Sequence, residues 1–186
     1  MKYLIVGLGN PGPEYELTRH NIGFLTLDRL ADKKKSNFEP GRLADVCEIK
    51  HKGRLVHLIK PNTYMNRSGK AVNYWLQQLK ISIDNLLIVT DDIALPFGKL
   101  RMRGKGSSAG HNGLKDIEST LGTSQYSRLK FGIGDNYSKG RQVDYVLGRF
   151  PNDEIEQLTD RMDKASEMIL SFATIGISKT MTLYNE

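Results

Sequence analysis

The sequence has only one cysteine, Cys47, among its 186 residues. A single thiol cannot form an internal disulfide, which excludes a disulfide-stapled secreted scaffold and favours a reducing, cytoplasmic compartment. Long apolar runs are missing too, because no stretch approaches the roughly 20 residues needed to cross a bilayer. The short apolar start does not have the form of a secretory signal. We therefore expect no membrane contact, and we expect Cys47 to be buried in the alternating segment "ADVCEIK".

Two kinds of catalytic motif are also missing. The nucleophile elbow G-x-S-x-G does not occur in the sequence. No two histidines have the spacing of metal ligands, because the four of them are scattered along the chain. They are His20, His51, His57 and His111. The sequence therefore disfavours a covalent serine or cysteine hydrolase, a protease and a metalloenzyme, and it predicts no metal or other cofactor.

Positive charge is in excess, with 27 lysines and arginines against 21 acidic residues. In "KLRMRGK", cations stand at every second position: Lys99, Arg101, Arg103 and Lys105. If residues 99–103 form a strand, these side chains share one face, because successive side chains of a strand point to opposite sides. Two interpretations stay open here: a surface that binds a polyanion, or a solvated edge strand whose cations discourage aggregation.

Periodicity along the chain predicts alternating strands and helices. Strands are expected at 2–6, 44–50, 54–60, 85–90, 99–103 and 128–134, with a turn at 51–53 between the second and the third. Helices are expected at 21–31, at 67–79, around 114–121 with Gly122 at the end, and from about 152 onward. No internal repeat or linker divides the sequence, so we expect one domain spanning residues 1–186. Its class is α/β with a mixed sheet.

The segment "GLGNPGPEYELTRHN" after the first strand matches the dinucleotide fingerprint G-x-G-x-x-G. That fingerprint requires a helix directly after the loop. Pro11 and Pro13 interrupt this loop, and a helical pattern begins only near Asn21. Asp28 stands about where a ribose-binding acid belongs, but it lies inside that helical pattern. We therefore interpret the match as accidental and disfavour an NAD-dependent oxidoreductase.

Polar residues nevertheless gather where the expected elements meet. Asn10 and His20 follow the first strand, and Asp91 follows the buried strand "NLLIVT". Asn66 and Asn112 precede helices, where an asparagine is also an ordinary N-cap, and Asp91 could simply open a turn. Each structural alternative is reasonable alone. Their combination at the carboxyl ends of strands favours a ligand site.

The motifs "VGLGNPG", "TRHNIGF", "MNRSGKAV", "DDIALPFG" and "GHNGLKDI" occur in this order over nearly the whole chain. With them the sequence resembles the bacterial peptidyl-tRNA hydrolase family. The resemblance implies a single α/β domain with a twisted mixed sheet sandwiched between helices, a monomer, and hydrolysis of the ester between a peptide and the 3′ end of tRNA. It assigns the essential histidine to His20, its partner aspartate to Asp91, and the asparagines of the site to Asn10, Asn66 and Asn112.

The residue types suit metal-free attack by water. A neutral imidazole is a suitable general base near neutral pH, so we expect His20 to take the proton and Asp91 to hold its ring. Asn10 and the two other asparagines offer amide donors for the oxyanion and the substrate, and the sequence does not distinguish among them. His111 is interpreted as a structural neighbour rather than a second base.

Peptidyl-tRNA is the expected partner, and its phosphates would contact Arg101, Arg103 and Lys105, with Lys99 and Lys130 as weaker candidates. Tyr64 and Phe97 lie in the site loops and could stack on a base, although ordinary packing is the preferred interpretation for both. An RNA-binding module without chemistry remains the alternative to the enzyme.

Overall fold

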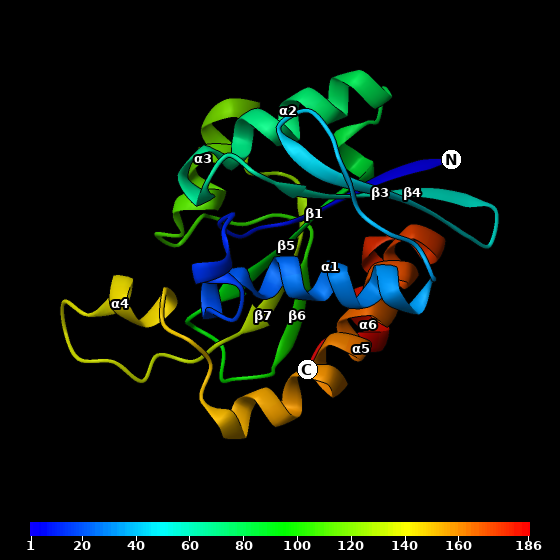
Figure 1. Ribbon diagram of the computed structural model, residues 1–186. Helices are drawn as coiled ribbons and strands as arrows, with labels where there is room; N and C mark the ends of the chain where they lie inside the picture. The colour runs from blue at the N-terminus through cyan, green and yellow to red at the C-terminus, as the bar shows by residue number, and fades with distance from the viewer.

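A computed structural model describes all residues, 1–186. The chain alternates between strands and helices along its length (Figure 1). The strands are β1 (Lys2–Gly7), β2 (Glu39–Pro40), β3 (Ala44–His51), β4 (Arg54–Pro61), β5 (Leu86–Asp92), β6 (Leu100–Arg103) and β7 (Ser127–Gly132). The α-helices are α1 (Ile22–Lys33), α2 (Ser68–Leu79), α3 (Asn112–Leu121), α4 (Gln142–Val146), α5 (Asn152–Ile175) and α6 (Ile177–Tyr184). Short 3-10 turns are η1 (Pro13–Tyr15), η2 (Arg19–Asn21), η3 (Met65–Arg67) and η4 (Ile83–Asn85).

All seven strands form one mixed sheet in the order β2-β3-β4-β1-β5-β7-β6. The four central strands β4, β1, β5 and β7 run parallel, so their carboxyl ends meet at one edge of the sheet. The outer pairs β2–β3, β3–β4 and β6–β7 are antiparallel. The α/β class with a mixed sheet is therefore confirmed, and so is the hairpin expected around residues 51–53.

Helices cover both faces of the sheet, with α2 and α3 on one side and α1, α5 and α6 on the other (Figure 1). The central strands are apolar on both sides, as expected for parallel strands covered by helices. In β5, Leu86 and Ile88 join the core beneath α2 and α3, while Leu87 and Val89 join the core beneath α1 and α5. No helix is long and apolar enough to cross a membrane.

The loop after β1 does not have the conformation of a dinucleotide-binding loop. Fourteen residues separate the end of β1 from the start of α1 at Ile22, and Asp28 lies within that helix, as expected. The glycines serve packing instead. A Cβ on Gly7 would lie 2.4 Å from the carbonyl oxygen of Gly23, and one on Gly9 would lie 2.8 Å from the ring of Phe24. These two glycines let α1 lie close to the end of β1, which brings the N-terminal end of α1 to the carboxyl edge of the sheet.

Three elements were not expected from the sequence, namely β2, α4 and α6. The strand β2 has only two residues, α4 has five residues without a buried one, and α6 is separated from α5 by Gly176 with φ +86°. Cys47 is buried on β3, as predicted. On α5, Met168 is buried in the core and the partly buried Met162 packs against it.

Candidate active site

The predicted polar residues come from loops at the carboxyl edge of the parallel strands. Asn10 and His20 follow β1, the segment with Tyr64 and Asn66 follows β4, and Asp91 is the last residue but one of β5. This edge is where open α/β sheets place their ligand sites.

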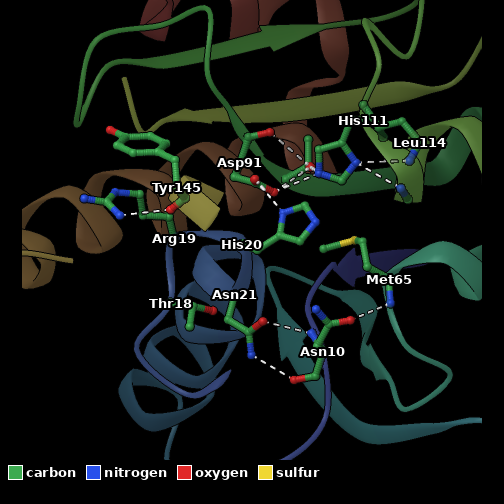
Figure 2. A network of polar contacts seen from close by, with 12 residues as sticks. Asn10, Thr18, Arg19, His20, Asn21, Met65, Asp91, His111, Leu114 and Tyr145 are labelled. Atoms are coloured by element: carbon green, nitrogen blue, oxygen red, sulfur yellow. Dashed lines mark hydrogen bonds and ion pairs between the residues drawn. The ribbon is translucent and has the colours of Figure 1, made fainter. Parts of the chain in front are cut away.

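His20 and Asp91 are in direct contact. The Nδ1 atom of His20 lies 2.7 Å from Oδ2 of Asp91, and both side chains are nearly enclosed, with 9 % and 3 % of the residue exposed. Figure 2 shows the imidazole directed away from η2 toward the carboxylate at the end of β5. An N–H at Nδ1 donates to the carboxylate, so Nε2 of the neutral ring is left free to accept a proton.

His111 binds the same carboxylate from the opposite side. Its Nε2 lies 2.8 Å from Oδ1 of Asp91 and 2.9 Å from Oγ1 of Thr90. Its Nδ1 accepts hydrogen bonds from the backbone N–H groups of Gly113 and Leu114 at the start of α3, at 3.1 and 3.3 Å. An acceptor at Nδ1 requires the proton at Nε2 in the neutral ring. The helix start therefore fixes the tautomer in which His111 donates toward Asp91.

The three residues His20, Asp91 and His111 are called the histidine–aspartate network below. The sequence spacing of its two histidines did not indicate that they lie close together. They are 91 positions apart, but their ring centroids lie only 5.0 Å apart, because β1 and β5 are adjacent in the sheet and α3 begins at the same edge. The expectation that His111 is a neighbour rather than a base agrees with the occupied Nδ1.

Opposing effects set the pKa values within the network. Burial lowers the pKa of His20, but the charge of Asp91 and its hydrogen bond outweigh this effect, so the pKa is raised above its ordinary value. Burial likewise raises the pKa of Asp91, but the charges of His20 and His111 and their hydrogen bonds hold it well below its usual range. The carboxylate is therefore ionised near neutral pH, and it stabilises an imidazolium on His20.

The network is also a possible set of metal ligands. One ligand atom from each of its three residues lies within 4.8 Å of the others. In the hydrogen-bonded arrangement, the nitrogens that face Asp91 carry protons, so a cation would have to displace both of them. The arrangement suits proton transfer without such a displacement.

Asn10 is held in one orientation by three hydrogen bonds. Its side-chain Oδ1 accepts from the N–H of Met65 at 2.7 Å. Its backbone N–H donates to Oδ1 of Asn21 at 2.8 Å, and its carbonyl accepts from Nδ2 of the same residue at 2.9 Å. Because Oδ1 is occupied, Nδ2 is the free donor, and Figure 2 shows it on the side of Asn10 where His20 lies. Nothing in the sequence indicated that Asn21 and Met65 orient Asn10, although Asn21 stands in "TRHNIGF" and Met65 in "MNRSGKAV".

The other two asparagines are exposed. Asn66 lies on η3 and Asn112 is the first residue of α3. The N-cap alternative for Asn112 is wrong, because His111 occupies that position and accepts the capping hydrogen bonds. Asn112 does line the cavity beside His20, whereas Asn66 is not among its lining residues.

The two aromatic residues of the site loops differ. Phe97 packs against Phe150 with ring centroids 5.9 Å apart, as the packing interpretation expected. The same interpretation is wrong for Tyr64, which is 53 % exposed. Its backbone has φ +61°, a region that L-residues rarely adopt. The hydrogen bond from the next residue, Met65, to Asn10 fixes this turn.

The predicted strand of cations is β6, at the open edge of the sheet. Leu100 and Met102 are buried, while Arg101 and Arg103 are partly exposed on the opposite face. Arg101 is paired in register with Lys130 of β7, which lines the cavity beside His20. These three residues, Arg101, Arg103 and Lys130, are called the basic face below. Lys105 is exposed in the loop beyond it, and the basic face thus extends from the site outward.

A small cavity adjoins the histidine–aspartate network. It measures about 80 Å³ and is bounded by the network, by the segment from Ser108 to Asn112 and by α4. The side chains of Gln142, Val143 and Val146 form the α4 wall. A space of this size accommodates ordered water next to His20.

Comparison with known proteins gives one consistent result. The sequence profile of a family described as peptidyl-tRNA hydrolase matches residues 4–186. Peptidyl-tRNA hydrolase from Cytophaga hutchinsonii is 54 % identical over 185 residues, which cover 100 % of this chain and 98 % of that protein. The protein of the same name from Phocaeicola vulgatus is 53 % identical, with 100 % of both chains covered.

Solved structures agree with the sequence comparison. The crystal structure of peptidyl-tRNA hydrolase from Acinetobacter baumannii superimposes with a TM-score of 0.91 at 35 % identity, covering 98 % of this chain and 94 % of that one. Similarity therefore extends over the whole fold and is not confined to the short motifs.

Proposed function

This chain belongs to the peptidyl-tRNA hydrolase family, and we propose how its own residues perform the reaction of that family. The enzyme releases tRNA from peptidyl-tRNA. The bond that breaks is the ester between the carboxyl group of the peptide and a ribose hydroxyl at the 3′ end of the tRNA. The observation that carries the mechanism is the 2.7 Å hydrogen bond between His20 and the buried Asp91.

His20 is the general base. Its Nε2 takes a proton from a water in the adjacent cavity as that water attacks the ester carbonyl carbon. The carbonyl oxygen becomes an oxyanion, and the imidazole becomes an imidazolium. When the tetrahedral intermediate collapses, the bond to the ribose oxygen breaks, and that oxygen takes the proton back from His20. No covalent intermediate or metal ion is required in this sequence of steps.

Asp91 holds the imidazole and stabilises the charge that it gains. Its Oδ2 accepts from Nδ1 of His20, which keeps Nε2 free of hydrogen in the resting enzyme. His111 occupies the other oxygen of Asp91. With both oxygens bound, the carboxylate cannot rotate away from His20. His111 is thus a positioning residue that acts through Asp91.

Asn10 is the donor for the oxyanion. It is the most buried of the three predicted asparagines, and its amide orientation is fixed by the N–H of Met65. A fixed donor costs no reorganisation when the oxyanion forms. The exposed Asn66 and Asn112 suit the bound peptide and ribose instead, and Tyr64 offers an exposed ring on which an aromatic group of the substrate can stack.

The tRNA phosphates bind the basic face and Lys105. Lys130 joins this surface to the cavity, since it lines the cavity and pairs with Arg101 in register. Charged contacts of this kind position the nucleic acid without reading its sequence. We propose that the chain acts as a monomer in the cytoplasm, where translation produces peptidyl-tRNA.

The test is deacylation of an N-blocked aminoacyl-tRNA in the presence of EDTA. We expect release by the wild type and a decrease of about 10²–10⁴-fold for His20→Ala, with tRNA affinity retained. His57→Ala, which alters a histidine on β4, is the matched control and should remain active. Activity of His20→Ala within about threefold of wild type would exclude His20 as the base. Absence of release by the wild type, with tRNA binding intact, would favour the RNA-binding alternative.

A further inference from the structure

Arg19 precedes His20 in the sequence and lies between two parts of the site. η2, which carries both residues, has no side-chain cap at Thr18. It is held instead by the segment that follows α4. The N–H of Arg19 donates to the carbonyl of Gly148 at 3.0 Å, and the N–H of Phe150 donates to the carbonyl of Leu17 at 3.1 Å. The backbone around the catalytic histidine is thus joined to a segment almost 130 residues away.

The side chain of Arg19 makes the same connection to α4 itself. Its Nη1 donates to the carbonyl of Tyr145 at 2.9 Å, and its Cζ lies 3.9 Å from the centroid of the Tyr145 ring. Figure 2 shows the guanidinium reaching Tyr145 on the side of η2 away from Asn10. A planar cation over an aromatic ring and a bond to a carbonyl fix both the position and the orientation of α4.

Two neighbouring features preserve this contact. A Cβ on Gly148 would lie 2.9 Å from Nη1 of Arg19 and 3.0 Å from the carbonyl of Asp144, so a side chain at 148 would displace the guanidinium or α4. On the far side, the hydroxyl of Tyr145 donates to the carbonyl of Ile133 at 2.6 Å. Tyr145 is therefore fixed between Arg19 and the chain that leaves β7.

Arg19 does not hold α4 through an ion pair. Its Nε atom is buried without a hydrogen-bond partner, and so is Oε1 of Glu154 at the start of α5. Burial raises the pKa of that carboxyl group against the opposing charge of Arg19. A buried donor without a partner is unfavourable. The favourable contacts of the guanidinium are therefore its stacking on the Tyr145 ring and its bond to the Tyr145 carbonyl, and both depend on its planar shape. A lysine would keep the charge and lose both.

Other residues of α4 line the cavity beside His20. Gln142, Val143 and Val146 form a wall of the cavity that His20 and Asp91 also line. Whatever fixes α4 relative to η2 therefore fixes the distance between this wall and the general base.

We propose that Arg19 is a positioning residue for the hydrolysis, and that its contact with Tyr145 sets the substrate-facing wall of α4 relative to His20. This inference rests on the proposed function of the site. A misplacement of about 1 Å at a reacting centre can cost about 10²-fold in rate. Loss of the contact should therefore reduce kcat more than it changes KM.

The experiment measures kcat, KM and Tm with an N-blocked aminoacyl-tRNA. Arg19→Lys and Tyr145→Leu should each lower kcat by about tenfold or more, with KM within about threefold and Tm close to that of the wild type. The double variant should be little worse than either single variant, because both remove the stacking of the guanidinium on the Tyr145 ring. Tyr145→Phe keeps the ring and loses only the bond to Ile133, so its loss should be smaller. Arg149→Ala removes an exposed cation from the same junction and should match the wild type.

Three results would overturn the inference while leaving the proposed function intact. The first is a kcat of Arg19→Lys and Arg19→Ala within about threefold of the wild type. The second is a loss that disappears when rates are corrected for the folded fraction, and the third is a double variant in which the two single losses multiply. An inactive wild type would instead contradict the proposed function, and this inference with it.

Discussion

The histidine–aspartate network and the basic face lie at neighbouring places on the same sheet, and they use charge in different ways. In the network, a buried carboxylate has a hydrogen bond at each oxygen. On the basic face, the cations of β6 and β7 are partly exposed, and Arg101 donates to the main-chain oxygen of Glu186. Buried charges act over one fixed geometry, whereas exposed charges are screened by salt and adapt to a flexible polyanion. Proton transfer needs the fixed geometry of buried charges, whereas docking of phosphates needs exposed charges that can adapt.

The largest effect is expected where the network loses its charge. In Asp91→Asn, the amide can donate to Nδ1 of His20, which would place the proton on Nε2 and block the base. An equivalent change in a Ser-His-Asp triad costs on the order of 10⁴ in turnover, and we expect at least about 10³-fold here. Single-turnover rates with saturating enzyme will measure the loss. Equal tRNA affinity of variant and wild type is the control, and a variant that retained a tenth of the activity would contradict the role of Asp91.

An intermediate effect is expected at His111, which has two separable contacts. In His111→Asn, the new side chain can still cap α3 but cannot reach Asp91. Loss of a hydrogen bond to a charged group corresponds to about 10–100-fold in kcat. His111→Ala should lose the same activity and, in addition, about 1 kcal/mol of stability because the cap is removed. Kinetics and urea unfolding of both variants separate the two contacts.

If His111→Asn retained full activity, the second hydrogen bond of Asp91 would have no part in catalysis. The fixed geometry that distinguishes the network from the basic face would then depend on His20 and Asp91 alone.

A smaller effect is expected on the basic face. Arg103→Ala should weaken tRNA binding by a similar factor for all tRNAs and reduce the slope of log K against log salt by about 1. Arg101→Ala should have less effect, because this guanidinium already donates to Glu186. Lys50→Ala, an equal charge change on β3 at the other side of the sheet, is the control. Filter binding over a series of salt concentrations measures the slope, and an unchanged slope for Arg103→Ala would show a merely solvated strand.

The smallest effect is a displacement of the pH profile. Protonated His20 cannot act as a base, so kcat/KM should fall as the pH decreases through its pKa. That pKa is raised, so the half-maximal pH should lie above the ordinary value of about 6.5. In Asp91→Asn, burial of His20 remains but the neighbouring negative charge is gone, so the pKa of His20 should fall. The acid limb of the pH profile, measured on the residual activity, should then move to lower pH. A limb that did not move would mean that Asp91 does not set the pKa of His20.

Sequence reasoning predicted much of this fold because the signals were local. Alternating and continuous apolar runs predicted the central strands, and the helices α1, α2, α3 and α5 were found from their periodicity. The alternation in "KLRMRGK" correctly placed Arg101 and Arg103 on one face. Short elements were missed because α4 has no buried residue and β2 has two residues, so neither carries a hydrophobic pattern.

The sequence indicated which polar residues gather at the carboxyl edge of the sheet, but not which of their side chains are in contact. Asn10 and His20 follow β1, Asp91 lies near the end of β5, and parallel strands bring their carboxyl ends together. The contacts of His111 with Asp91 and of Arg19 with Tyr145 join segments 20 and 126 positions apart. No local pattern records which side chains meet across such distances, and for this reason the four histidines looked unrelated.

The sequence by itself determined the class of fold, the set of polar loops and the excess of positive charge, because these follow from residue type, periodicity and spacing. Only the tertiary structure decided that one buried carboxylate serves two histidines, that His111 rather than Asn112 caps α3, and that Tyr64 is exposed. The physical reason is that orientation, burial and tautomer are set by neighbours in space. The sheet order brings β1 beside β5, and hydrogen bonds to Tyr145 and Gly148 hold η2 beside α4.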